Sequence, residues 1–222
     1  IDELFVLSEK HYMTIVDMLL QRDYKLNIWA YARVDTVKAE NLGKMKKAGI
    51  NWLALGIESA NPDVRDGAQK RMRVKDVKNV VRAIQNAGIR VIGNYIFGLP
   101  DDSFKTMQET LDMAVELNCE FANFYCAMAY PGSKLYDIAV KEGWKLPKEW
   151  HGFSQHSYEM LPLPTKHLTA KEVLGFRDEA FHKYFENPGY LGMIEEKFGK
   201  DVKGHIGEMT KTRLRRKYLE TA

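Results

Sequence analysis

The sequence is dominated by a repeated unit in which an amphipathic helix pattern ends at a glycine and an apolar, strand-like run follows. The helix patterns of residues 39–48 and 74–87 end at Gly49 and Gly88, and each precedes a run rich in Ile, Leu and aromatic residues. Such runs are typical of strands that are covered on both faces of a sheet. Strands that alternate with helices pair in parallel through right-handed crossovers, so the sequence predicts an α/β fold.

The same pattern predicts where each strand and helix lies along the chain. Four strands are expected at residues 26–35, 50–59, 89–98 and 120–132, and a fifth strand is expected to end at Asp2 and Glu3. Helices are expected at residues 9–22, 39–48, 74–87, 103–117 and 134–142. Two architectures satisfy this order, an open doubly wound sheet and a (β/α) barrel. In both, ligands bind where the carboxyl ends of the strands meet.

The chain divides into three regions. Residues 1–143 carry the alternation, residues 144–162 lack a sustained period and are expected to wrap over the first region, and residues 163–222 are expected to form a helical appendage. Thr169 and Glu172 have the spacing of a capping box at the start of its main helix. The appendage holds 12 Lys and Arg against 9 Asp and Glu, which accounts for the whole net charge of +3. Its basic cluster, Arg213, Arg215, Arg216 and Lys217, is typical of a solvated helix end, so a nucleic-acid partner is not expected.

Composition and missing motifs exclude several classes of protein. Hydrophobic residues make up 45% and charged residues 28%, which is the balance of a globular protein. No run approaches the ~18 apolar residues of a membrane span and no signal peptide is visible, so a cytoplasmic location is expected. A P-loop, a G-x-G-x-x-G motif and a nucleophile elbow are all absent from the sequence. Cys119 and Cys126 are too few for a disulfide framework and are expected to be buried thiols.

Polar residues at the expected strand ends have the chemistry of one kind of ligand. Asp2 and Glu3 can pair with an ammonium group, and Arg33 can bind a carboxylate with two parallel hydrogen bonds. Glu58 beside Ser59 can accept hydrogen bonds from the two hydroxyls of a ribose. The apolar strand around Ile96 offers contact to a planar base, so the set describes S-adenosylmethionine. The alternative is that these are ordinary polar residues that face water.

Five segments in order, "DE", "WAYARVD", "GIES", "GNYIFGLPDD" and "YPGSKLY", resemble the radical S-adenosylmethionine enzymes. The similarity is greatest to the branch whose members often carry an N-terminal cobalamin-binding domain. It covers roughly residues 1–143, and the helix "FRDEAFHKYF" is also similar to the tail of that branch. The resemblance implies a partial (β/α) barrel of six parallel strands, about five of which are present here.

The resemblance also implies cofactors and roles. S-adenosylmethionine would bind an open iron of a [4Fe–4S] cluster and be cleaved to a 5′-deoxyadenosyl radical, with cobalamin as a further cofactor of the branch. Asp2 or Glu3 would bind the methionine amino group, and Glu58 and Ser59 the ribose and methionine carboxylate, with Arg33 nearby. Asn94 replaces the first glycine of the family's adenine-contacting strand, and Tyr130 would bound the cavity beside Ile96. The implied partners are a small-molecule substrate and a reductant such as flavodoxin or ferredoxin.

The family's cluster motif, CxxxCxxC, is absent from this sequence. Three thiolates in that motif leave one iron open for substrate, so this chain is expected to lack the metal ligands. Two explanations stay open: the chain begins after the cluster loop, as a start at Ile1 near the end of the second strand suggests, or the protein has lost the chemistry. Methyl transfer, ring closure, rearrangement and methylthiolation are all reactions of the family. The alternatives are a non-catalytic barrel remnant that binds a nucleoside-like ligand or a partner, and another (β/α)-barrel lyase.

Overall fold

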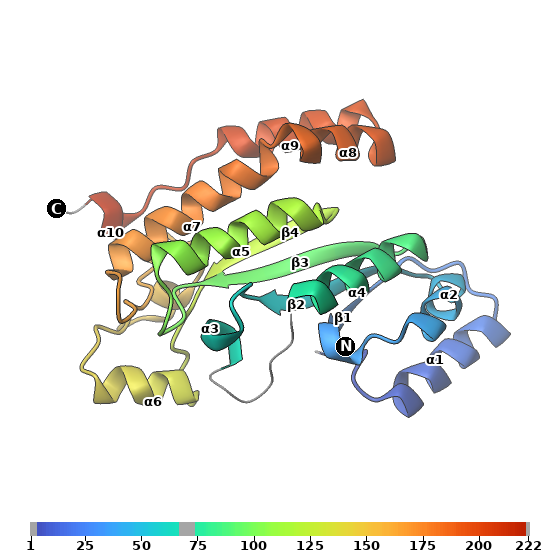
Figure 1. Cartoon of the computed structure of the whole chain (residues 1–222), viewed down its shortest axis with the longest axis horizontal. Helices are drawn as coiled ribbons and strands as arrows, with labels where there is room; N and C mark the ends of the chain where they lie inside the picture. Colours follow the sequence, from blue (N-terminus) through green and yellow to red (C-terminus); the bar gives the residue numbers. More distant parts are fainter. Residues whose placement is uncertain (1–3, 67–73, 221–222) are drawn as a thin grey trace.

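The computed structural model describes residues 4–66 and 74–220 and contains a parallel sheet with strand order β1-β2-β3-β4 (Figure 1). The strands are β1 (Ile28–Arg33), β2 (Ile50–Glu58), β3 (Arg90–Phe97) and β4 (Phe121–Cys126). Consecutive strands are neighbours, and helices connect them. The predicted class, an α/β fold resembling a partial barrel with C-terminal helices, is confirmed.

The fifth strand that the sequence predicts would lie at the edge of the sheet beside β1. In the part of the chain that the structure describes, Val6 forms an isolated parallel bridge with Ala32, and its N–H donates a 3.1 Å hydrogen bond to the carbonyl of Tyr31. Asp2 and Glu3, the expected end of that strand, lie outside the described residues. The described chain therefore contributes four strands and one bridge.

The helices follow the sequence pattern closely. The described α-helices are α1 (Glu9–Gln21), α2 (Ala39–Lys47), α3 (Pro62–Asp66), α4 (Val74–Asn86), α5 (Phe104–Leu117), α6 (Lys134–Lys141), α7 (Ala170–Phe185), α8 (Pro188–Phe198), α9 (Lys200–Lys211) and α10 (Lys217–Glu220). The short 3₁₀ turn η1 (Val34–Thr36) follows β1, and a second one, η2 (Trp150–Phe153), lies within the 144–162 segment. Helix α3 has no counterpart among the expected elements, and β4 ends well before residue 132. Every helix in the described ranges is too short or too polar to cross a membrane.

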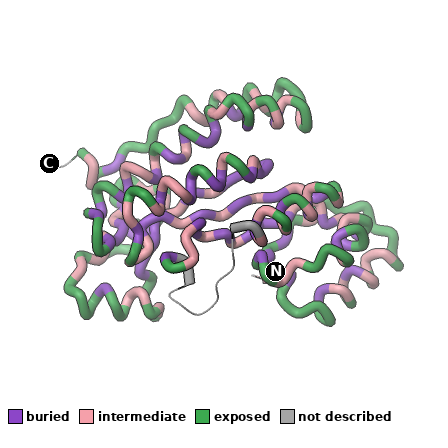
Figure 2. Tube along the Cα trace, in the orientation of Figure 1, coloured by how far each residue is buried: buried purple, intermediate pink, exposed green. Residues whose placement is uncertain are grey.

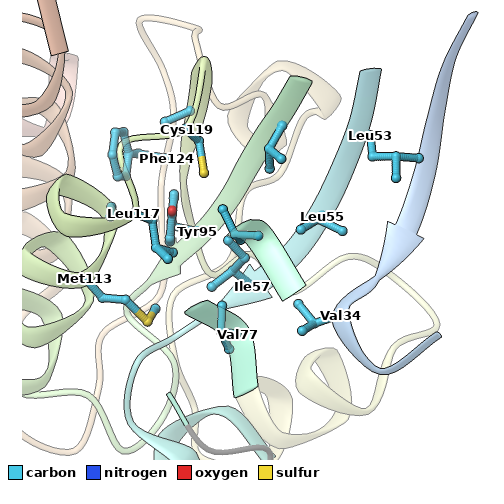
Figure 3. Packing of buried hydrophobic residues seen from close by; sticks show 14 of the residues in the cluster. Val34, Leu53, Leu55, Ile57, Val77, Tyr95, Met113, Leu117, Cys119 and Phe124 are labelled. Carbon is cyan, nitrogen blue, oxygen red and sulfur yellow. The ribbon is translucent and has the colours of Figure 1, made fainter. Parts of the chain in front are cut away.

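The helices cover one face of the sheet and bury its alternate residues. Helices α2, α4, α5 and α7 contact the strands, α2 packs against α4, and α5 packs against α7. Figure 2 shows the buried positions concentrated along the strands and the helix faces turned toward them. In Figure 3, Leu55, Ile57 and Tyr95 from the sheet meet Val77 of α4 and Met113 of α5. The opposite face of the sheet carries the candidate site described below.

The 144–162 segment and the C-terminal helices are fastened to the edge strand β4. The side chain of Gln155 donates to the carbonyl of Cys126 and accepts from its N–H, both at 3.0 Å. The buried carboxylate of Glu120, just before β4, accepts from the N–H of Val91 at 2.8 Å and pairs with Lys197 of α8. The bonds from Gln155 satisfy groups at a sheet edge that no further strand covers in the described chain.

Candidate functional site

The face of the sheet turned away from the helices carries polar and aromatic side chains, and we call it the open face. Its positions alternate with buried ones, as in β3, where half-buried and fully buried residues follow one another from Arg90 to Phe97. The period of two of a β-strand therefore separates the open face from the core. The open face consists of the side chains of Trp29, Tyr31, Arg33, Glu58, Asn94, Ile96, Asn123 and Tyr125.

The strand register brings several predicted residues into one row. Arg33 pairs with Gly56, Gly56 with Asn94, and Asn94 with Asn123. The row runs from the last residue of β1 to the middle of β4, and the carboxyl ends of β2, β3 and β4, where a parallel sheet presents its ligand sites, lie a few residues beyond it. Two residues further toward the carboxyl end of β3, Ile96 pairs with Tyr125 of β4 on the same face.

The two asparagines in this row bind each other. Asn123 Nδ2 donates a 3.0 Å hydrogen bond to Asn94 Oδ1, and Asn94 Nδ2 donates a 3.2 Å bond to the carbonyl of Leu55. The bonds fix the orientation of Asn94, which lies in the strand that contacts adenine if the family resemblance holds. Asn123 belongs to the site as well, and its signal in the sequence is a polar residue inside an otherwise apolar strand.

Glu58 ends β2 in a backbone conformation that is rare for a residue with a side chain. Its φ is 65°, and the pairing of β2 with β3 shifts register between Gly56 and Glu58. A Cβ at Gly56 would stand 2.8 Å from Glu58 Oε1, so the carboxylate lies over that glycine on the open face. Bulges of this kind redirect side chains and are common beside active sites. The backbone thus directs Glu58 toward the open face.

Tyr125 of β4 is a member of the site that sequence reasoning missed. Burial raises the pKa of its half-buried phenol, Tyr31 raises it further, and the charge of Glu58 acts in the same direction. Tyr31, Glu58 and Tyr125 lie on the same face of the sheet, although they come from three different strands. The signal in the sequence is the spacing of two between Asn123 and Tyr125, which places both on the same face.

Arg33 lies at the site and forms an ion pair with Asp35. Its Nε and Nη2 donate to the two carboxylate oxygens of Asp35 at 2.9 and 2.8 Å. Both side chains are well exposed, at 52% and 36%, so the pair is worth little to stability. The remaining N–H groups of Arg33 leave it able to bind a second carboxylate without losing Asp35.

Ser59, in contrast, does not face the open side of the sheet. The residue is fully buried, and its Oγ lies 3.2 Å from the hydroxyl of Thr110 on α5. It also accepts a 3.2 Å hydrogen bond from the N–H of Asn61, and Thr110 accepts from the N–H of Ala60. These bonds fasten the loop after Glu58 to helix α5.

Tyr130 lies beyond the end of β4, against the 144–162 segment. Its hydroxyl donates a 3.4 Å hydrogen bond to the carbonyl of Phe153, and the two rings stack with centroids 5.9 Å apart. Arg33, Glu58, Asn94, Ile96 and Tyr130 therefore lie on or beside one surface. Asp2 and Glu3 are not described, and their role stays a prediction.

The turn Gly98-Leu99-Pro100-Asp101-Asp102 is held by the protein itself. Asp102 Oδ2 accepts from the N–H groups of Gly98 and Leu99 at 2.9 and 3.0 Å, and burial raises the pKa of this carboxyl. Gly98 has a φ of 82°, and a Cβ there would stand 2.5 Å from Val173 Cγ1 of α7. The hydroxyl of Thr165 donates to the carbonyl of Asp102. The glycine in this turn is therefore required by the close approach of α7.

The two cysteines do not fit an iron–sulfur cluster. Cys119 and Cys126 are free thiols, both buried in the core on the helix side of the sheet. Burial raises the pKa of each thiol to about 12, whereas cluster ligands are thiolates. Among the residues that the structure describes, no group of three His, Cys, Asp or Glu side chains could hold a metal ion.

Residues 7–114 match the family model described as the Radical SAM superfamily. The chain is 25% identical to an uncharacterized methyltransferase of Pyrococcus horikoshii over 215 residues, which are 97% of this chain and 45% of that protein. It is 25% identical to the heme chaperone HemW of Bacillus subtilis over 211 residues, 90% of this chain and 54% of that one. The chain thus spans about half the length of these relatives.

Two solved structures share the fold. The radical S-adenosylmethionine methyltransferase TsrM from Kitasatospora setae, solved with cobalamin and a [4Fe-4S] cluster, has a TM-score of 0.51 and 18% identity over 56% of this chain and 24% of its own. Elp3 of Methanocaldococcus infernus has a TM-score of 0.50 and 16% identity over 90% of this chain and 58% of its own. At these identities the likeness concerns the fold.

Proposed function

This chain belongs to the radical SAM superfamily, and we propose that it forms the S-adenosylmethionine-binding part of an enzyme that cleaves this molecule to a 5′-deoxyadenosyl radical. The observation that carries the proposal is that Glu58, Asn94 and Tyr125, from three neighbouring parallel strands, lie on the open face of the sheet. These groups come from three strands and share one surface because the sheet is built in chain order.

The residues take separate roles in this proposal. Glu58, held in place by the bulge, accepts hydrogen bonds from the ribose hydroxyls. Ile96 gives the adenine an apolar contact beside the fixed amide of Asn94. Arg33 binds the methionine carboxylate with the N–H groups that Asp35 leaves unused. Ser59 is a positioning residue, because its buried hydroxyl fastens the loop after Glu58 to Thr110.

The cofactors belong to the same proposal. A [4Fe–4S] cluster would supply the electron for the cleavage, and its ligands would lie outside this sequence, since Cys119 and Cys126 are buried and protonated. A reductant such as flavodoxin or ferredoxin would deliver that electron. Methyl transfer is the preferred reaction, because a sequence relative and a structural neighbour are both called methyltransferases. Cobalamin is the further cofactor suggested by the second of these.

The experiment compares two charge-neutral substitutions in the full-length protein with its cluster. Glu58→Gln removes the carboxylate from the open face, whereas Glu196→Gln removes an exposed carboxylate on α8 and serves as the control. Calorimetric titration with S-adenosylmethionine should show a loss of about 1–3 kcal/mol for Glu58→Gln and none for the control. Reduction with dithionite should release 5′-deoxyadenosine from the unaltered protein.

The outcomes separate the alternatives. Equal affinity of Glu58→Gln and the unaltered protein would show that the open-face residues are assigned wrongly. Binding of S-adenosylmethionine without any 5′-deoxyadenosine would favour a non-catalytic barrel remnant. If the unaltered protein neither bound nor cleaved S-adenosylmethionine, the proposed function as a whole would be contradicted.

A further inference from the structure

A cavity of about 460 Å³ lies between strand β4 and the C-terminal helices, and we call it the β4–α7 cavity. Strand β4 contributes Asn123 and Tyr125, α7 contributes Arg177 and Phe181, and α9 contributes Met209. The volume falls in the range of small-molecule sites, about 300–1,000 Å³. Asn123 and Tyr125 also belong to the open face, so the cavity adjoins the proposed S-adenosylmethionine site.

Arg177 and Asp178 line the cavity, and Arg216 lies directly behind them. Asp178 Oδ1 accepts from Arg177 Nη1 at 2.8 Å and from Arg216 Nη2 at 2.9 Å, and its Oδ2 accepts from Arg216 Nε at 2.9 Å. The side chains of Arg177 and Arg216 are 5% and 0% exposed, and Asp178 is the one carboxylate among the lining residues of the cavity. Two buried guanidinium groups therefore share a single carboxylate. A buried positive charge without a counterion is unfavourable, and an anion in the cavity would offset it.

Arg177 also has a donor to spare. Its Nε donates to the carbonyl of Phe124 at 2.7 Å and its Nη1 to Asp178. Within the described chain, Arg177 Nη2 has no hydrogen-bond partner, while all three nitrogens of the Arg216 guanidinium are bonded, Nη1 to the carbonyl of Ser157. Arg177 lines the cavity, so its Nη2 is the donor left for a ligand.

The other titratable groups of the wall add no negative charge. Burial lowers the pKa of His156, and Arg177 and Arg216 lower it further, so its imidazole is neutral near pH 7. Burial raises the pKa of Tyr125, which keeps its phenol protonated. His182 is bonded to Glu186 across one turn of α7, with 3.0 Å between Nδ1 and Oε1. The wall thus presents several hydrogen-bond donors, and Arg177 is its one basic side chain that carries a charge near pH 7 independently of histidine.

The strand edge beside the cavity is not available for pairing with another strand. Gln155 occupies both the N–H and the carbonyl of Cys126, and Arg177 occupies the carbonyl of Phe124. An extended peptide would need these groups to continue the sheet. The remaining wall is apolar, from residues such as Phe181 and Met209. The occupant therefore has the character of a small molecule.

We propose that the β4–α7 cavity binds a small organic carboxylate with an apolar body, with the carboxylate on Arg177 and the body against Phe181 and Met209. Its place beside the open face makes this ligand the substrate of the radical reaction. The ligand's role as a substrate rests on the proposed function, whereas its chemical class rests on the residues of the cavity alone.

The test uses octanoate as the probe, with 1-octanol as its uncharged counterpart, titrated by calorimetry into the full-length protein without S-adenosylmethionine. Octanoate should bind at least about tenfold more tightly than octanol, as a charge-assisted hydrogen bond provides. Arg177→Gln should remove this preference. Lys183→Gln, which deletes an exposed positive charge on the same helix, should leave it intact.

A second variant keeps the test decisive if Arg177→Gln does not fold. Met209→Trp adds bulk to the cavity wall and should weaken octanoate and octanol alike, by about tenfold or more. Octanoate binding no tighter than that of octanol would overturn the assignment of an anionic ligand. Octanoate binding unchanged by Met209→Trp would overturn its location. Because S-adenosylmethionine is titrated separately, failure of either assignment is visible without the other.

Discussion

Arg216 and Asp178 are joined by two parallel hydrogen bonds, Nε to Oδ2 and Nη2 to Oδ1, each 2.9 Å long. The Arg216 side chain is fully buried although it belongs to a basic stretch that the sequence assigns to a solvated helix end. Its Nη1 donates to the carbonyl of Ser157 in the 144–162 segment. One guanidinium therefore connects α7, that segment and the chain after α9, and the prediction of a solvated cluster is wrong at this residue.

Arg216→Ala should lower the free energy of unfolding by about 3 kcal/mol, because it leaves a partly buried carboxylate short of a partner and opens a gap behind α7. Urea unfolding followed by circular dichroism measures this loss. Arg213→Ala, an exposed change three positions away, should stay within about 0.5 kcal/mol of the unaltered protein. Equal midpoints for the two variants would show that the buried pair contributes nothing.

The stability of the protein should depend on pH through Asp178. Burial alone raises the pKa of this carboxyl, but hydrogen bonds from Arg216 and Arg177 outweigh burial and hold the pKa below its ordinary value. A lowered pKa means that the stabilisation is complete above the unfolded-state pKa of about 4 and is lost as the pH falls through the folded-state value. Asp178→Asn should therefore differ most from the unaltered protein at pH 6–7 and least near pH 3, in urea unfolding series. A difference that stays constant with pH would contradict this linkage, and Glu196→Gln is the control.

Alanine substitutions at two glycines with positive φ should distinguish the cost of backbone strain from the cost of a steric clash. Gly98 and Gly132 have φ values of 82° and 86°, but a Cβ at Gly98 meets Val173 at 2.5 Å whereas nothing lies within 4 Å at Gly132. Gly132→Ala should cost about 1 kcal/mol of stability from the left-handed backbone. Gly98→Ala should cost about 1–3 kcal/mol more from the clash. The double variant Gly98→Ala with Val173→Ala should recover part of that difference in thermal unfolding; no recovery would place the strain elsewhere.

Cys119 and Cys126 should be inert in the folded protein. Burial raises the pKa of both thiols to about 12, so the reactive thiolate is scarce at pH 8. Iodoacetamide at pH 8 should label neither cysteine in buffer and both in 6 M guanidinium, as counted by peptide mass spectrometry. Cys119→Ala and Cys126→Ala should also leave the iron content of the reconstituted full-length protein unchanged. Rapid native labelling, or loss of iron in either variant, would contradict the buried, non-ligating role.

Elements set by local contacts are the ones that the sequence predicts well. Helix α7 begins at Thr169 as expected, because Thr169 and Glu172 satisfy each other's N–H groups across three residues. Ser103 caps α5 in the same way. Gly49 and Gly88 end α2 and α4 with positive φ values that favour glycine. The period of two likewise separates the buried and open positions of β3.

Features that depend on distant partners required the folded chain. Ser59 and Glu58 are adjacent in sequence, yet Ser59 is buried against Thr110, 51 positions away, while Glu58 lies on the open face. Tyr125 carries no local mark of its nearness to Tyr31 and Glu58.

The amino-acid sequence is sufficient to predict the alternation of helices and strands, the parallel order of the sheet and the end of each strand where polar residues gather. Its patterns arise from neighbours a few positions apart, which the chain brings together in any context. The burial of Arg216, the role of Ser59 and the sharing of Asp178 by two arginines beside the β4–α7 cavity come only from the tertiary structure. Each depends on a partner that is far away in sequence, such as Asp178 at 38 positions from Arg216, and the free energy of burying a polar group is decided by that partner.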